Sequence, residues 1–169
     1  MTAPRPPQGF ALHHLPTGPA WIRPSIQKPL LSTWKKLNPH APLRQAARRH
    51  PQHRLFQGRA PVVLLPITTT PLIVRPCVHG GLWGKFAKDL YTNTTRALKE
   101  IERSSLLSTK KIPTPLIQAA LFYPAGSLWR IDIVTSYIPQ QPGSRLTPLH
   151  SPILPHPDPC FLLHPQVIL

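Results

Sequence analysis

The sequence predicts a mostly disordered, irregular and proline-rich chain with a small α+β centre at about residues 61–138. Twenty-five of its 169 residues are proline, and each proline removes a backbone donor and fixes φ. The formal net charge of +15 opposes compaction by self-repulsion. Leu, Ile, Val and Phe nevertheless make up 47 of the 169 residues, above the roughly 20% floor of fully disordered chains. We therefore expect a folded centre between flexible arms.

The N-terminal arm, residues 1–58, holds ten of the prolines. Its apolar residues show no sustained period of 2 or 3.6, so we expect it to be disordered or extended. Good helix formers within residues 42–56 allow one short helix before Pro51 interrupts it.

The centre, residues 59–138, should hold one amphipathic helix and a few short strands. Two β-branched runs within residues 61–76 are punctuated by proline, which predicts edge strands. The helix is expected at 85–108, with Phe86, Leu90, Ala97 and Ile101 on one face and Glu100 and Glu102 on the solvent side. A second short helix is expected at 114–122.

Alternating residues at 127–138 predict a strand, with Trp129, Ile131 and Ile133 on one face. From residue 139 to 169 the chain is again dominated by proline, and we expect an extended C-terminal tail. The expected division is thus a basic arm, a foldable centre and a tail.

No constellation in the sequence supports catalysis. General acid–base, covalent and electrostatic catalysis require paired carboxylates, a nucleophile with a base, or preorganised donors. The chain has five Asp and Glu in all, and three of them fall on or beside one helix face. We expect a binding protein that is not an enzyme and carries no cofactor.

The basic arm is the feature with the clearest mechanism. Thirteen Lys and Arg precede Asp89, the first acidic residue. Cationic side chains contact phosphates, and an aromatic ring stacks on bases. This arm is therefore expected to bind nucleic acid, with RNA favoured over DNA. The candidate residues are Lys35, Lys36, Arg44, Arg48, Arg49 and Arg54, with Trp34 as the stacking ring.

The alternative is an adaptor that engages host proteins through its proline-rich segments and the 85–108 helix, with the charge serving localisation. Within residues 122–128, FYPAGSL resembles the tyrosine–proline–spacer–leucine late-domain peptides of viral structural proteins, which recruit budding machinery. That resemblance implies partner binding through Tyr123, Pro124 and Leu128. The simpler interpretation makes Tyr123 a core or turn residue.

Metal binding is not expected. His156, Cys160 and His164 have ligand chemistry suited to zinc and a four-residue spacing. Pro157 and Pro159 forbid the regular helix that would place them on one face, which leaves them weak candidates.

The chain is expected to act inside a cell, in the nucleus, nucleolus or cytoplasm. Two cysteines indicate a reducing compartment, and no signal segment or membrane span is evident. The bias towards Pro, Leu, Thr, His, Arg and Ser is one that codon choice imposes on a reading frame laid over another gene. We therefore expect an accessory protein of a compact viral genome, acting in the host cell.

Overall fold

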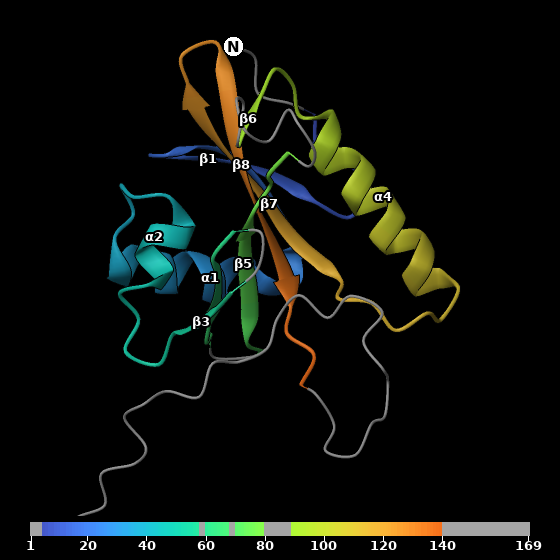
Figure 1. Ribbon diagram of the computed structural model, residues 1–169, viewed down its shortest axis with the longest axis horizontal. Helices are drawn as coiled ribbons and strands as arrows, with labels where there is room; N and C mark the ends of the chain where they lie inside the picture. Colours follow the sequence, from blue (N-terminus) through green and yellow to red (C-terminus); the bar gives the residue numbers. More distant parts are fainter. Residues whose placement is uncertain (1–4, 58–59, 68–69, 80–88, 140–169) are drawn as a thin grey trace, which may run out of the picture.

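An eight-stranded antiparallel sheet with helices on both faces organises the computed structural model (Figure 1). The structure describes residues 5–57, 60–67, 70–79 and 89–139. The strand order is β1-β2-β7-β8-β5-β4-β3, and β6 pairs with β8 beside this path. The strands are β1 Ala11–Leu15, β2 Gly18–Ile22, β3 Arg54–Phe56, β4 Val62–Leu65, β5 Leu72–Pro76, β6 Leu90–Tyr91, β7 Ile117–Ala125 and β8 Leu128–Ser136. The helices are α1 Pro24–Leu37, α2 Leu43–Ala47 and α4 Thr95–Thr109.

The prediction of a mostly disordered chain is wrong. The N-terminal arm supplies five elements, and its first hairpin joins the centre of the sheet because β2 pairs with β7. At the other edge, β3 pairs with β4 across the boundary expected at residue 58. The arm folds despite its ten prolines because these lie mainly in turns and at element ends, where a missing donor costs little. The tail expected from residue 139 lies, from residue 140 on, outside the described residues.

The β7–β8 hairpin is the middle of the sheet. Its two nine-residue strands meet at Ala125 and Leu128, and Gly126 between them adopts the left-handed conformation with φ +63°. The strand expected at 127–138 is thereby confirmed as β8. The helix expected at 114–122 is wrong, because β7 begins at Ile117. A strand buried on both faces reads as a continuous apolar run, which periodicity cannot distinguish from a helix segment.

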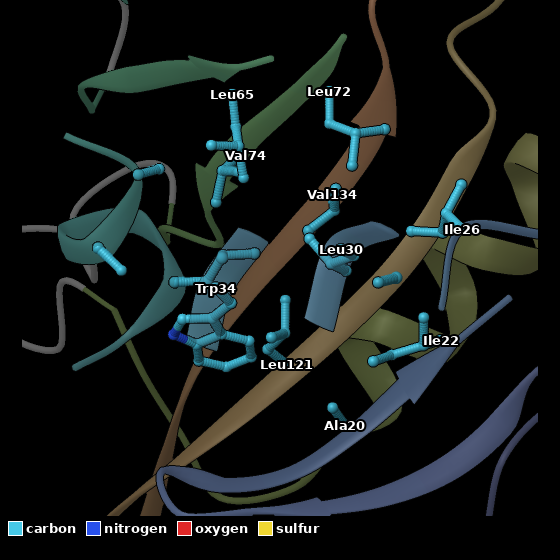
Figure 2. Packing of buried hydrophobic residues seen from close by; sticks show 14 of the residues in the cluster. Ala20, Ile22, Ile26, Leu30, Trp34, Leu65, Leu72, Val74, Leu121 and Val134 are labelled. Atoms are coloured by element: carbon cyan, nitrogen blue, oxygen red, sulfur yellow. The ribbon is translucent and has the colours of Figure 1, made fainter. Parts of the chain in front are cut away.

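The first layer, α1 and α2, covers one face of the sheet. Ile26, Leu30 and Trp34 recur one helical turn apart and pack on strand residues such as Leu121 and Val134 (Figure 2). This burial holds α1 together although Pro29 lies inside it and removes one backbone donor. The short α2 confirms the helix expected within residues 42–56.

The second layer, α4, lies on the opposite face (Figure 1). Ala97 and Ile101 are buried there as expected, but the helix begins at Thr95 and not at residue 85. Leu90 belongs to β6, and residue 86 lies outside the described residues. Glu102 is exposed, whereas the Glu100 side chain is only 14% exposed, contrary to the expectation that it faces solvent. Glu100 is held in place by two arginines.

The two β-branched runs of residues 61–76 form strands, but neither is an edge. β5 lies between β8 and β4, and β4 lies between β5 and β3. Pro66 and Pro71 fall outside the strand limits, so they interrupt no ladder. The prediction that proline keeps these runs out of the sheet interior is therefore wrong.

Candidate nucleic-acid interface

The outer side of α1 carries lysines at helical spacing. Lys28, Lys35 and Lys36 are exposed, and with Ser32 they recur at intervals of three and four residues on the side away from the core. Lys35 and Lys36 also occupy the last turn, where a positive charge complements the negative end of the helix dipole. Lys28 was missed as a candidate, although its spacing from the two predicted lysines was a usable signal.

Two arginines extend this charge at the end of α2. Arg48 is the C-cap residue and Arg49 follows it, and both are exposed. The helices α1 and α2 contact each other and share one hydrophobic cluster against the sheet. We define the basic layer as the five exposed cations of this pair of helices: Lys28, Lys35, Lys36, Arg48 and Arg49.

The basic layer has no counter-charge among the residues that the structure describes. Asp132 pairs with Arg44, Glu100 with Arg75 and Arg96, and Asp89 with Arg130. Glu102 lies on α4, on the other side of the sheet. None of the five cations of the basic layer makes an ion pair with a described residue. Their charge is therefore available to an external polyanion.

Trp34 cannot stack on a base in this fold. Its side chain is 3% exposed and packs in the cluster beneath α1, and its indole N–H donates to the carbonyl oxygen of Ala41 (N···O 3.1 Å). The expectation of an exposed ring beside the lysines is corrected by helix geometry. Trp34 falls on the same face as Ile26 and Leu30, and Lys35 falls on the other.

Arg54 is separated from the other predicted arginines. It belongs to β3, where it shares a face with Phe56, and it lines a cavity beside α4 on the opposite side of the sheet from α1. Residues two apart in a strand point to the same face. The sequence places Arg54 five residues from Arg49, but the fold places the two side chains in different layers.

Arg44 takes part in an internal contact. Its Nε lies 3.8 Å from Oδ1 of Asp132, whose side chain is 4% exposed beneath α2. Burial raises the pKa of Asp132 to about 6, against the opposing effects of Arg44 and of the Tyr123 hydroxyl. The other carboxylate oxygen, Oδ2, is buried without a hydrogen-bond partner among the described residues. The arginine therefore serves the fold. Asp132 was missed because the alternation at residues 127–138 sets it opposite the apolar row of Ile131 and Ile133.

The predicted partner-binding residues lie in the central hairpin. Tyr123 is buried, and its hydroxyl oxygen accepts a hydrogen bond from the backbone N–H of Leu43 (N···O 2.9 Å). Burial raises the pKa of Tyr123 well above its ordinary value. Pro124 is exposed and Leu128 is half-buried. A protein that binds such peptides could not reach the Tyr123 side chain unless β7 left the sheet. The position of Tyr123 is therefore that of a core residue, as the simpler interpretation had it.

The weak metal candidates His156, Cys160 and His164 lie outside the described residues. Within the described ranges, no group of three or more His, Cys, Asp or Glu is arranged to hold a metal ion. Cys77 is buried, and burial, the largest of several influences, raises the pKa of its thiol to about 12, which keeps it protonated at neutral pH.

No family model, curated protein or solved structure matches this chain. In the part of the chain that the structure covers, no helix is long and apolar enough to cross a membrane.

Proposed function

We propose that this protein binds nucleic acid, without sequence preference, through the basic layer on α1 and α2. The observation that carries the proposal is the segregation of charge. Three of the four described carboxylates are paired with arginines that do not belong to the basic layer, and the five cations of the basic layer have no acidic partner among the described residues. Lysines and arginines held on rigid helices contact phosphates and release counterions.

The burial of Trp34, the one aromatic ring of α1, supports a mode of binding through phosphate contacts. Trp34 is buried, so stacking on its ring, which contributes affinity to many single-strand binders, is not available there. Phosphate contacts position a strand but carry no sequence information. RNA was the partner expected first, and this surface gives it no advantage over DNA. The proposed role is that of a non-enzymatic accessory protein that coats or tethers nucleic acid.

The experiment is a fluorescence-anisotropy titration of a labelled single strand of about 20 nucleotides, as RNA and as DNA, across about 50–200 mM salt. The variant K35Q/K36Q/R48Q/R49Q should weaken binding of both strands. The slope of log K against log salt should fall by roughly 0.7 for each phosphate that the variant no longer neutralises.

The control is R54Q/R103Q, which removes two arginines from the other side of the sheet and is compared with R48Q/R49Q, which removes two from the basic layer. The control should leave the salt slope within error of wild type. Equal weakening by the control, or a four-site variant that binds as wild type does, would refute the basic layer as the binding surface. Circular dichroism spectra of all variants establish that each is folded.

A protein-interaction role is the second candidate, because two large apolar side chains near the end of α4 remain exposed. Leu106 is 55% and Ile112 is 47% exposed. In that case the variant L106S/I112S would abolish capture of a defined host protein, and the four-site basic variant would only relocate the chain. Pull-down with both variants separates the two functions.

A further inference from the structure

A cavity of about 490 Å³ lies between α4 and the strands at the β3 edge, on the face away from the basic layer. Ile73, Thr135 and Ile117 form one row across its floor, because Thr135 pairs with Ile73 on β5 and with Ile117 on β7. Leu107 of α4 forms part of its wall. Ile138 lines the cavity and is 52% exposed.

The charged side chains of the lining are mostly positive. The lining contains three arginines, Arg54, Arg75 and Arg103, and one carboxylate, Glu100. Glu100 is already bound to Arg75, with Nη2 and Oε2 2.6 Å apart, and to Arg96. Arg54 and Arg103 are exposed and form no ion pair with any residue in the described ranges. The cavity thus combines an apolar floor with two free guanidinium groups.

This combination defines the chemistry of an occupant. A site of roughly 300–1,000 Å³ that is apolar with a few polar groups is typical of small-ligand pockets. Guanidinium binds a carboxylate through two parallel N–H···O bonds. A strand of nucleic acid suits the floor poorly, because its sugars and phosphates would desolvate without partners against Ile73 and Ile117. A cationic amphiphile would meet like charge.

We propose that this cavity binds a free long-chain carboxylate, with the chain on the floor of Ile73, Thr135 and Ile117 and the carboxylate on Arg54 and Arg103. The site is independent of the basic layer and of nucleic-acid binding. It gives the protein a second ligand of a different chemical class, held on the opposite face of the sheet.

The experiment uses the full chain and a fluorescent fatty acid, 11-(dansylamino)undecanoic acid, displaced by palmitate. We expect saturable fluorescence enhancement and displacement by palmitate but not by methyl palmitate, which has the same chain without the charge. The variant R54Q/R103Q should weaken binding about tenfold. The variant R48Q/R49Q, which removes the same charge from the basic layer, should change binding by less than about twofold.

Location is tested by NMR of isoleucine methyl groups. Palmitate should shift the signals of Ile73 and Ile117 and leave that of Ile26, beneath α1, in place. Unmoved Ile73 and Ile117 signals at saturating palmitate would show that the ligand does not occupy this cavity, and would overturn the proposal. Two other results would show that the binding is non-specific adsorption: methyl palmitate displaces the probe as well as palmitate does, or R48Q/R49Q weakens binding as much as R54Q/R103Q does. Either result would also overturn the proposal. Because nucleic-acid binding is measured separately, either proposal can fail alone.

Discussion

Arg44 of α2 and Asp132 of β8 meet 88 positions apart in the sequence, with Nε 3.8 Å from Oδ1, at the junction between the basic layer and the sheet. The attraction between Arg44 and Asp132 does not offset the cost of desolvating the carboxylate. This is shown by the pKa of Asp132, which burial raises to about 6 despite Arg44. The pair therefore positions α2 at a cost in stability that depends on pH. Buried ion pairs commonly behave this way.

Folding stability should depend on pH through Asp132. The folded state holds a proton on Asp132 up to about pH 6, whereas an unfolded Asp releases it near 3.9. Between these values the folded state binds more protons, so this group makes the free energy of unfolding fall as pH rises. The decrease is complete about one pH unit above the folded-state pKa, near pH 7, and amounts to about 3 kcal/mol.

Asp132→Asn imitates the protonated side chain and should remove that slope. We expect the variant to be more stable than wild type at pH 7.5 and similar to it below about pH 4. Urea denaturation at a series of pH values measures the difference. Glu102→Gln removes a carboxylate from the exposed side of α4 and serves as the control. A variant that is less stable at pH 7.5 would show that Arg44 outweighs desolvation.

The hydroxyl of Tyr123 should stabilise the fold through its hydrogen bond to α2. Tyr123→Phe leaves the buried backbone N–H of Leu43 without its acceptor. We expect the free energy of unfolding to fall by roughly 1–3 kcal/mol, the usual cost of an unsatisfied buried group. Tyr137→Phe is the control, since the Tyr137 hydroxyl makes no hydrogen bond with described residues. Equal effects in chemical denaturation would contradict the role assigned to Tyr123.

Two glycines of positive φ should differ in their tolerance of a side chain. Gly18 has φ +134°, and a Cβ there would collide with the carbonyl oxygen of Phe122 and lie 2.9 Å from Cδ of Pro124. Gly126 has φ +63° with nothing within 4 Å of a Cβ. Gly18→Ala should therefore cost about 3 kcal/mol or more, and Gly126→Ala about 1 kcal/mol. Thermal denaturation measures both, and the reverse order would place β2 further from β7 than described.

The two arginines on Glu100 should contribute unequally to stability. Arg75 joins β5 to α4 through a 2.6 Å contact, whereas Arg96 lies one turn from Glu100 on the same helix at 2.9 Å. Arg75→Met should cost roughly 1–3 kcal/mol, because it removes the tie between layers from a carboxylate that is mostly buried. Arg96→Met should cost about 0.5 kcal/mol or less. Chemical denaturation of both variants measures the two losses in the free energy of unfolding. Equal losses would contradict the role assigned to the Arg75–Glu100 contact in joining β5 to α4.

Local patterns in the sequence were sufficient for the position of one strand and for the buried face of one helix. The alternation at residues 127–138 predicted β8, and the apolar spacing of Ala97 and Ile101 predicted the core face of α4. Charge indicated the exposed lysines of α1, because lysine side chains seldom leave solvent. The spacing of Lys28 from Lys35 and Lys36 would have added it to this set, once residues 24–37 were read as a helix.

The wrong predictions concern features that patterns among neighbouring residues do not determine. A segment covered on both sides loses its period, so β7 resembled a helix, and the prolines around β4 and β5 resembled strand breakers. Burial of Trp34 and Asp132 follows from which helix packs on which strand, which is a property of distant segments.

The net positive charge, the acid-free N-terminal half and the two clearest amphipathic segments follow from the order of the residues alone. These features depend on composition and on neighbours within a few positions. The packing of distant segments was needed to make the basic arm part of a sheet, to turn Arg44 inward to Asp132, and to separate Arg54 from Arg48 and Arg49. Pairings such as β2 with β7 join residues about a hundred positions apart, and the burial that stabilises them arises only when both strands are in place.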